Sequence, residues 1–241
     1  MSPPTAVANA DDPRSGTLPE RQVEAMFDRI SSVYDLMNSV MTAGLHHRWR
    51  ARAADLARLR PGDKALDVAT GTGDLAVELA RRGATVTGCD FSEAMLAIAR
   101  DKAPDVQFMH ANALSLPFER DSFDAATVGF GARNFSDLER GLGEMVRVVR
   151  PGGRVVVLEI TTPRRPPLST FFKLWFDRIV PLLGRVAGDA DAYAYLPSSV
   201  RRFPDAGALA AVLARLGLDE IRYLVTAGGV IAIHAGTVKG S

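Results

Sequence analysis

The segment Leu66-Asp67-Val68-Ala69-Thr70-Gly71-Thr72-Gly73-Asp74-Leu75-Ala76 decides the fold of this chain. A short apolar run ends at small residues, turns at two glycines and continues with a helical pattern. This order predicts a strand, a tight loop and a helix N-terminus, the entrance to a nucleotide-type site in an α/β sheet. The same residues fit the dinucleotide fingerprint G-x-G-x-x-A, so the first question is which ligand the loop binds.

Two acidic residues argue against a dinucleotide. Asp74 falls in the first turn of the helix, where a carboxylate suits the positive helix end but repels a pyrophosphate that needs the same place. Asp67, just before the glycines, adds negative charge. A ligand with a cationic amino-acid part and no phosphate suits this loop better, and S-adenosylmethionine has that chemistry. The alternative is an NAD-binding oxidoreductase, for which the chain shows no recognisable hydride-transfer residues.

The predicted cofactor contacts follow the ends of successive strands, because ligands of such sheets lie beyond the carboxyl ends of the strands. Asp90 ends the second predicted strand, residues 84–90, and is placed to accept both ribose hydroxyls. Its alternative role is the N-cap of the helix at 92–103, for which Ser92 is the better residue. Asn112 and Ala113, after the third strand, are candidates for reading the adenine edge, and the alternative for Asn112 is a turn. The full set of cofactor candidates is Asp67, Thr70, Gly71, Thr72, Gly73, Asp90, Phe91, Asn112, Ala113 and Gly129.

Strand and helix patterns alternate along the rest of the chain. Further strands are predicted at 106–110, 123–130 and 154–160, and helices at 74–82, 136–149 (capped by Ser136) and 205–216. Two runs, 220–225 and 230–235, are joined by a short glycine-containing turn and predict an antiparallel hairpin. The fold class is therefore α/β, a doubly wound Rossmann-like sheet that is mostly parallel with one reversed strand. We expect a disordered lead-in at 1–22 and one domain at 23–241, with a helical cap at 23–60 and an apolar helical insertion at 168–200, which carries Tyr193 and Tyr195 on a loop.

Composition limits the classes of partner and compartment. The 241 residues carry a net charge of +1, which gives no electrostatic case for nucleic acid. A single cysteine, Cys89, excludes an internal disulfide and fits a reducing compartment. No uncharged apolar run reaches the ~18 residues that a membrane span needs, and no signal peptide is evident. We therefore expect a cytoplasmic protein.

Three stretches resemble one family across nearly the whole chain, from about Val23 to Lys239. The first is Phe27-x6-Tyr34-Asp35-x-Met37-Asn38 with Gly44-x-His46-x2-Trp49. The second is Phe130-Gly131-x-Arg133-Asn134, followed by Pro151-Gly152-Gly153-Arg154 and Leu158-Glu159. The third is Tyr193-x-Tyr195-Leu196-Pro197-x-Ser199-Val200-x2-Phe203-Pro204-Asp205, then Thr226-Ala227-Gly228-Gly229-Val230-x-Ala232-x-His234-x-Gly236. The chain resembles the demethylmenaquinone and ubiquinone-biosynthesis C-methyltransferases, which are class I S-adenosylmethionine enzymes.

The resemblance implies a reaction and part of the site. It implies that Thr72, Asp90, Asn112 and Ala113 contact S-adenosylmethionine, and that a ring carbon of a polyprenylated quinol is methylated without a metal. One departure is Gly129, where the family often has serine. The favoured acceptor is demethylmenaquinol, because the arginine-rich composition resembles that of GC-rich bacteria that make menaquinone. A benzoquinol of the ubiquinone pathway, and a methyltransferase for another lipid or small molecule, remain alternatives.

Five residues are candidates for the acceptor side of the site. Arg133 can stabilise a developing phenolate and Asn134 can hydrogen-bond a quinol oxygen. Tyr34 and Tyr195 can stack on the ring or hydrogen-bond it, and for each a structural role at an element end is the alternative. His46 is a further acceptor-side candidate, with a capping or helix-surface role as its alternative, and the identity of the general base stays open. An intact Arg133-Asn134 pair argues against a binding protein without catalysis.

The stretch from Leu168 to Val186 forms a broad apolar surface in which a few charges keep the pattern amphipathic. One interpretation is a lid or tunnel wall for the isoprenoid tail that also docks on the inner face of the cell membrane. The other is ordinary packing over the sheet. The sequence leaves the oligomeric state open.

Overall fold

One seven-stranded sheet forms the centre of the part that the computed structural model describes, residues 19–163, 166–174, 178 and 190–240. Its strands are β1 (Lys64–Val68), β2 (Thr85–Asp90), β3 (Gln107–His110), β4 (Phe123–Gly129), β5 (Val149–Ile160), β6 (Leu218–Thr226) and β7 (Ile231–Val238). The spatial order is β3-β2-β1-β4-β5-β7-β6. Neighbours from β3 to β5 pair in parallel, whereas β7 pairs antiparallel with both β5 and β6. The predicted sheet with one reversed strand is confirmed.

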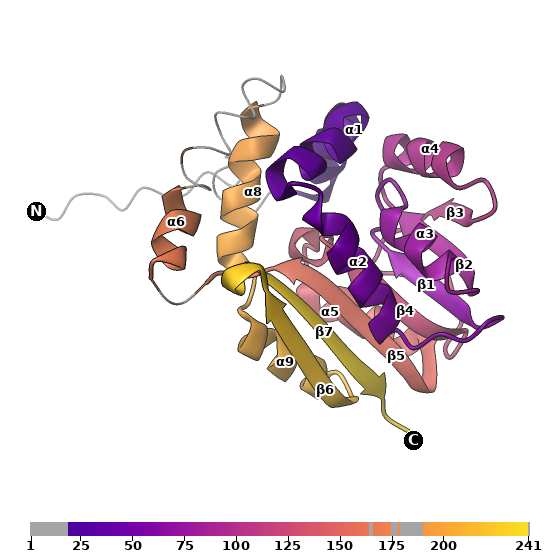
Figure 1. Cartoon of the computed structure of the whole chain (residues 1–241). Coiled ribbons are helices and arrows are strands. Elements are labelled where there is room, and N and C mark those ends of the chain that lie inside the picture. The colour runs from indigo at the N-terminus through magenta and orange to yellow at the C-terminus, as the bar shows by residue number, and fades with distance from the viewer. Residues whose placement is uncertain (1–18, 164–165, 175–177, 179–189, 241) are drawn as a thin grey trace, which may run out of the picture.

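Helices cover both faces of the sheet (Figure 1). The described helices are α1 (Glu20–Thr42), α2 (Leu45–Leu56), α3 (Asp74–Ala80), α4 (Glu93–Lys102), α5 (Leu138–Val148), α6 (Leu168–Leu174), α8 (Ala190–Arg202) and α9 (Ala206–Arg215), with short 3₁₀ turns η2 (Ala132–Asn134) and η4 (Ala227–Gly229). Alternate residues of β5 supply the two cores. Val155 and Val157 pack with α5 and α9, while Val156 and Leu158 pack with α2, α3 and α4. Apolar residues on both faces are typical of a parallel sheet buried between helices.

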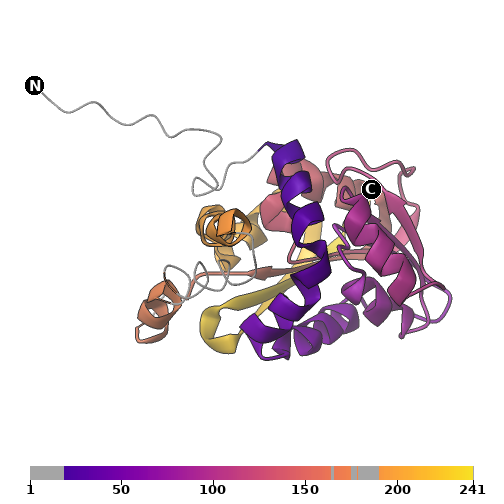
Figure 2. The same ribbon diagram turned by 90° about the horizontal axis from the view of Figure 1, so that it is seen from above.

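The first helix lies across the carboxyl edge of the sheet, between α8 on one side and α4 on the other (Figures 1 and 2). Two of its acids fix it to the loops beneath. The Thr72 hydroxyl donates to Asp35 over 2.6 Å, and the Ser92 hydroxyl donates to Asp28 over 2.5 Å. α1 begins at Glu20, within the segment predicted as lead-in, and residues 1–18 of that lead-in lie outside the described residues.

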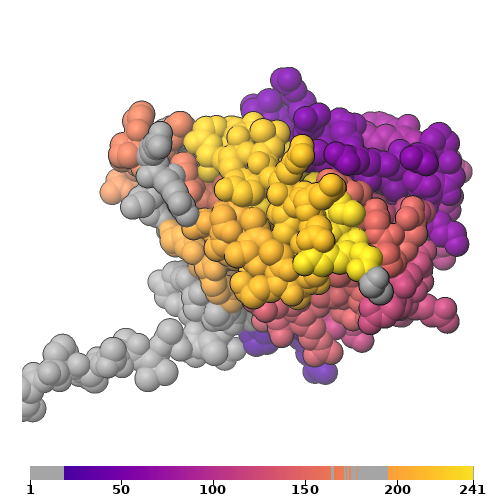
Figure 3. Space-filling model, turned by 90° about the horizontal axis from the view of Figure 1, so that it is seen from below, coloured from indigo at the N-terminus to yellow at the C-terminus, as the bar shows by residue number. Residues whose placement is uncertain are grey.

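The C-terminal part differs from expectation at one element. The segment with Tyr193 and Tyr195 was expected to be a loop, but it lies in helix α8. Pro197 is inside this helix, and burial of Tyr195 and Val200, 3% and 2% exposed, outweighs the helix-breaking tendency of the proline. Viewed from below, the orange-to-yellow C-terminal residues fill the middle of one molecular face (Figure 3). Much of the stretch from Leu168 to Val186 lies outside the described residues, which include its first helix, α6.

A second difference concerns the start of α5. Ser136 was expected to cap this helix, but the cap is Asp137, whose carboxylate accepts from the backbone N–H of Arg140. The hydroxyl of Ser136 instead donates to Glu20 on α1. Both residue types are good caps, and a tertiary contact that the sequence pattern does not contain decides between them.

Within the described residues, no helix is both long enough and apolar enough to cross a membrane.

Two glycines of α5 give opposite predictions on replacement by alanine. A Cβ at Gly141 would lie 2.5 Å from the ring of Phe135, whereas a Cβ at Gly143 would find its nearest neighbour at 3.7 Å, which is ordinary contact. We expect Gly143→Ala to stabilise the protein by up to about 1 kcal/mol through helix propensity. Gly141→Ala should destabilise it by about 1–3 kcal/mol through overpacking. Urea unfolding of the two variants tests this, and equal effects would contradict it.

Candidate functional site

The carboxyl end of β1 buries a carboxylate among neutral partners. Asp67 is 1% exposed and accepts hydrogen bonds of 2.6 Å from the hydroxyls of Thr70 and Thr127. Burial raises the pKa of Asp67 to about 6, and the two hydroxyl bonds oppose that shift. Because hydroxyls cannot neutralise a charge, the Asp67 carboxylate is suited to attract a cationic ligand group.

The carboxyl end of β2 places a second buried carboxylate against the glycine loop. Asp90 is 6% exposed and accepts from the backbone N–H of Gly71 over 2.8 Å and of Ser92 over 2.9 Å. Burial raises its pKa to about 6, which the backbone bonds partly counter. Ser92 caps α4, as expected, because its hydroxyl accepts from the N–H of Met95. Asp90 therefore joins the first two cofactor loops.

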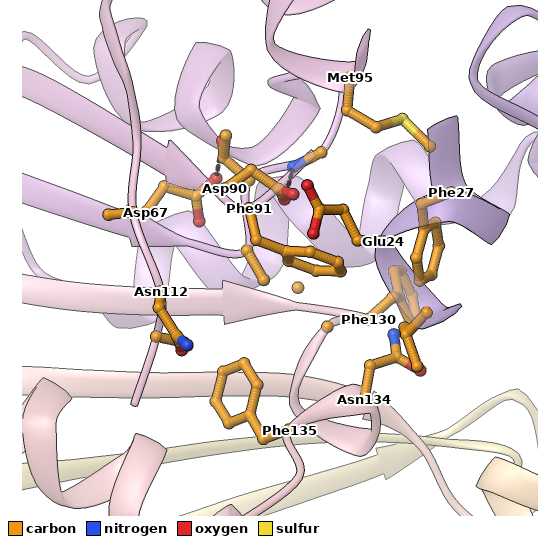
Figure 4. A pocket seen from close by; sticks show the side chains of 18 of the residues that line it. Glu24, Phe27, Asp67, Asp90, Phe91, Met95, Asn112, Phe130, Asn134 and Phe135 are labelled. Carbon is orange, nitrogen blue, oxygen red and sulfur yellow. Dashed lines mark hydrogen bonds between the residues drawn. The ribbon is translucent and has the colours of Figure 1, made fainter. Parts of the chain in front are cut away.

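A cavity of about 200 Å³ lies over these loops (Figure 4). Nine of the ten predicted cofactor residues line it: Asp67, Thr70, Gly71, Thr72, Asp90, Phe91, Asn112, Ala113 and Gly129. The tenth, Gly73, does not line the cavity. It has φ +83° as the residue before α3, and a Cβ there would meet Phe108 and Ala99 at 3.0 and 3.2 Å. Its role in the structure is to turn the chain into the helix.

The side chain of Asn112 forms the turn that was its alternative role. Its Oδ1 accepts from the N–H of Leu114 over 2.8 Å, and its Nδ2 donates to Glu20 of α1 over 3.2 Å. The carboxylate of Glu20 thus lies at the end of the cavity where the adenine edge was predicted. Contact of Asn112 with adenine stays a prediction.

A second cavity of about 390 Å³ adjoins the first. Its walls come from α1, α2, α6, α8, η2 and the end of the hairpin, and they are mostly apolar. All five predicted acceptor-side residues line it: Tyr34, His46, Arg133, Asn134 and Tyr195. The residues that line both cavities are Phe27, Tyr34, Arg50, Phe130 and Asn134, so these five mark the boundary between the two.

A buried ion pair fixes Arg133 in the second cavity, next in sequence to Asn134 of the boundary. Its Nη1 donates to the Glu159 carboxylate over 2.8 Å and to the backbone carbonyl of Phe130. Arg133 and Glu159 are 9% and 1% exposed. In the described part, Nε of Arg133 and Oδ1 of Asn134 are buried atoms without a hydrogen-bond partner. Such atoms are costly unless a ligand completes them, so this donor and this acceptor indicate a polar ligand group in the second cavity.

The side chain of His46 is 2% exposed and both of its ring nitrogens have partners. Nε2 lies 3.1 Å from the Ser39 hydroxyl, and Nδ1 contacts Nη1 of Arg50. Burial, and then the charge of Arg50, lower the His46 pKa to about 4, so the ring is neutral at pH 7. Because a guanidinium only donates, Nδ1 is the acceptor and Nε2 carries the proton.

The ligand atoms of His46, His47 and Asp74 lie within 4.8 Å of one another, a grouping that the sequence did not predict. Arg50 lies 3.4 Å from Asp74, and Lys102 lies 2.7 Å from the same carboxylate. Two cations beside the only acid of the group are unfavourable for a metal ion.

Sequence reasoning did not single out Arg50, Glu159, Glu20 or Glu24, which join the site. Glu159 had one detectable signal, a charged residue near the end of an otherwise apolar strand. Arg50 had the helical spacing of four from His46. Glu20 and Glu24 reach the first cavity from α1 and have no local signal. Figure 4 shows Glu24 in this position.

The charged lining fits S-adenosylmethionine and not a dinucleotide. The described lining of the first cavity contains the acids Glu20, Glu24, Asp67, Asp74 and Asp90, and the arginines Arg21 and Arg50. An excess of acids attracts a sulfonium and an ammonium and repels a pyrophosphate. With the strand order and a ligand cavity at the carboxyl edge, these features define a class I S-adenosylmethionine-dependent methyltransferase.

Comparison with known proteins gives the family. The model of the ubiE/COQ5 methyltransferase family matches residues 16–238, and the chain belongs to this family. It is 47% identical over 218 residues to a demethylmenaquinone methyltransferase of Thermus thermophilus, covering 88% of this chain and 99% of the relative. It is 38% identical over 227 residues to the ubiquinone/menaquinone biosynthesis C-methyltransferase UbiE of Teredinibacter turnerae, covering 90% and 91%.

Solved structures of lower identity share the fold. A Thermotoga maritima S-adenosylmethionine-dependent methyltransferase, described as a possible histamine N-methyltransferase, is similar at a TM-score of 0.62 and 22% identity, covering 90% of this chain and 99% of that one. The [4+2]-cyclase SpnF is similar at a TM-score of 0.67 and 22% identity, covering 92% and 97%.

The raised pKa of Asp90 predicts a pH-dependent contribution to stability. The pKa of Asp90 is about 6 in the folded protein and 3.8 for an ordinary aspartate, so between these values the folded protein holds more protons than the unfolded chain. Its contribution therefore falls as pH rises from about 4 to 6. Asp67 titrates in the same window and the Asp90 charge raises its pKa, so the difference between wild type and Asp90→Asn reports Asp90 together with its effect on Asp67. In chemical unfolding without cofactor, the free energy of unfolding of the variant relative to that of wild type should rise by up to about 3 kcal/mol between pH 4 and pH 7. A constant difference would contradict this.

Proposed function

We propose that this protein methylates a ring carbon of a polyprenylated quinol, with demethylmenaquinol as the acceptor and menaquinol as the product. The observation that carries the proposal is the pair of adjoining cavities, one acidic and the other apolar with unpaired polar atoms of Arg133 and Asn134 in its lining. The named activities of the Thermus and Teredinibacter relatives support it. The acceptor's ring then lies at the boundary and its isoprenoid tail in the apolar cavity.

In this proposal the first cavity holds the cofactor through both carboxylates. Asp90 accepts the ribose hydroxyls while it keeps the backbone bonds that fix the loops. Asp67 attracts the ammonium of the methionine part. Gly71, with φ +56° and no atom within 4 Å of a Cβ position, lets the backbone approach the ligand. Ala113 and Asn112 border the adenine, and when bound the cofactor supplies an electrophilic methyl group from its sulfonium.

The second cavity holds the acceptor in a reactive form. A quinol ring carbon becomes a good nucleophile when a hydroxyl loses its proton, because the negative charge spreads into the ring. Arg133 stabilises that phenolate by charge, and Glu159 keeps the guanidinium in place. Asn134 presents an acceptor to a quinol hydroxyl. After the new carbon–carbon bond forms, the same ring carbon loses its hydrogen as a proton, and the aromatic quinol is restored.

Aromatic side chains hold the ring between the cavities. Tyr34 lines both cavities and Tyr195 lines the second. Phe130 also lines both cavities. Its φ of +62° is a conformation that non-glycine residues rarely adopt and that clusters at functional sites. His46, with both nitrogens engaged, orients Arg50 in this proposal, and a bound water is the better candidate for removing protons. Most of the acceleration comes from positioning two bound partners.

The function is tested by methyl transfer from labelled S-adenosylmethionine to chemically reduced demethylmenaquinol. A ubiquinol precursor and both oxidised quinones serve as comparisons. We expect label in the naphthoquinol product and none from the oxidised forms. Label in neither quinol, with cofactor binding intact, would overturn the proposal in favour of another lipid or small-molecule acceptor.

The same assay tests Arg133. Removing it alone leaves Glu159 buried without a cation, so the test uses Arg133→Met together with Glu159→Gln. We expect turnover to fall about 10²- to 10³-fold while the affinity for S-adenosylhomocysteine changes less than about threefold. The exposed Arg120→Met is the matched control. Unchanged turnover in the folded double variant would remove Arg133 from the mechanism.

We further propose that the mouth of the second cavity contacts a phospholipid surface, which makes the protein cytoplasmic and peripheral at the membrane. Exposed apolar residues lie on three of the helices that line the second cavity: Leu36 and Val40 on α1, Leu45 on α2, and Leu168 and Leu174 on α6. Arg48, exposed in the first turn of α2, adds positive charge beside Leu45. An apolar rim with basic neighbours suits an anionic bilayer that contains the isoprenoid tail.

Liposome flotation tests this contact. We expect the protein to float with anionic liposomes at low salt, and Leu36→Ser with Val40→Ser to reduce the floated fraction severalfold. Leu224→Ser is the matched control, because Leu224 is an exposed apolar residue that lines neither cavity. Absence of wild-type binding would refute the membrane contact and leave the methyl-transfer proposal standing.

A further inference from the structure

Arg50 is a buried cation at the boundary of the two cavities. Its side chain comes from α2, is 5% exposed, and lies with its guanidinium carbon 5.4 Å from the centre of the Phe130 ring. It lines both cavities. A buried guanidinium requires partners, because removing this charge from water is costly.

The described residues satisfy only one end of the guanidinium. Nη1 contacts Nδ1 of His46 and lies 3.4 Å from the Asp74 carboxylate. Nε and Nη2 have no hydrogen-bond partner among the described residues. A guanidinium carries five N–H donors in a planar fork that matches a carboxylate. The free side of Arg50 is therefore a ready site for a planar anionic group.

The charges around Arg50 balance, and the acid nearest to it contacts only its Nη1. Asp74 is shared, since Lys102 Nζ lies 2.7 Å from its other oxygen, and Lys102 also lies 2.7 Å from Asp35. The two acids and the two cations cancel, while His46 adds no charge. The first cavity is thus lined by both a cation, Arg50, and a buried carboxylate, Asp67, whose hydrogen-bond partners are neutral hydroxyls. This pair of opposite charges complements an amino-acid zwitterion.

We propose that Arg50 binds the carboxylate of the cofactor's methionine part, with the ammonium directed toward Asp67. This inference rests on the cofactor half of the proposed function and does not depend on the acceptor. It makes α2, which lies outside the glycine loop, part of the cofactor site. His46 acts as a positioning residue, because its bond to Nη1 leaves the other donors directed to the ligand.

Calorimetry with three ligands tests the assignment without turnover. S-adenosylhomocysteine has the whole amino-acid part, its decarboxylated analogue lacks only the carboxylate, and 5′-methylthioadenosine lacks both charged groups. Arg50→Met keeps apolar contact with Phe130, and Lys102 still neutralises Asp74. We expect this variant to bind S-adenosylhomocysteine about 10- to 100-fold more weakly, and the other two ligands within about twofold of wild type.

Controls separate the assignment from a loss of fold. Arg52→Met alters an exposed arginine of the same helix and should leave all three affinities unchanged. If Arg50→Met fails to fold in a thermal melt, Arg50→Lys replaces it, and the loss should again be confined to S-adenosylhomocysteine because a point charge lacks the fork. Equal weakening of all three ligands, or no weakening of any, would overturn the proposal. Failure of the protein to methylate a quinol would leave this assignment of Arg50 unaffected.

Discussion

Parallel strands of one sheet end at a common edge, and this constraint places every group of the site. Between parallel strands the chain must cross back over a face of the sheet, so successive carboxyl ends come together. The register of β1 with β2 and β4 brings Asp67, Asp90 and Gly129 to that edge, although the last is far from the first two in sequence. The loops are in contact as well, since a Cβ at Gly131 would lie 2.6 Å from that of Ala69. The cap and the hairpin end then need only cover one edge to enclose a ligand.

Buried charge is concentrated at this edge, although Arg154 on β5, 8% exposed, is a buried charge elsewhere. In the cores, side chains are apolar and closely packed, whereas at the edge Asp67, Asp90, Arg50, Arg133 and Glu159 are nearly inaccessible to solvent. Each is held by protein partners on one side and faces a cavity or an adjacent charge on the other. Such an arrangement lowers stability in the empty protein, as the raised pKa values of Asp67 and Asp90 indicate. The ligand that completes these partners recovers that loss, so binding and stability are linked.

The sequence was sufficient for the sheet and for many of the residues that line the two cavities, but not for their internal contacts. Strand ends and glycine turns have local signals, and nine of the ten residues predicted from them line the first cavity. The Arg133–Glu159 pair and the contacts of Glu20 join residues 26 and 92 or more positions apart, and no period in the sequence encodes them. Helix α8 was missed because Pro197 is a local breaker, whereas its burial is a tertiary effect. The cap of α5 is Asp137 and not the predicted Ser136, again because of a tertiary contact, the bond of Ser136 to Glu20.

The likeness to a [4+2]-cyclase at a TM-score of 0.67 shows why the sheet alone cannot define the reaction. The glycine loop and Asp90 belong to the part of the fold that bears a cofactor, and many chemistries can use that part. In this chain a second cavity, with walls from α1, α2, α6 and α8, lies over the same edge. In this chain the boundary carries a fixed guanidinium, an amide and aromatic rings, which suits an acidic aromatic acceptor. In the proposed function, the reaction is therefore specified where cap and sheet meet, at Tyr34, Phe130, Arg133 and Asn134, and neither layer specifies it alone.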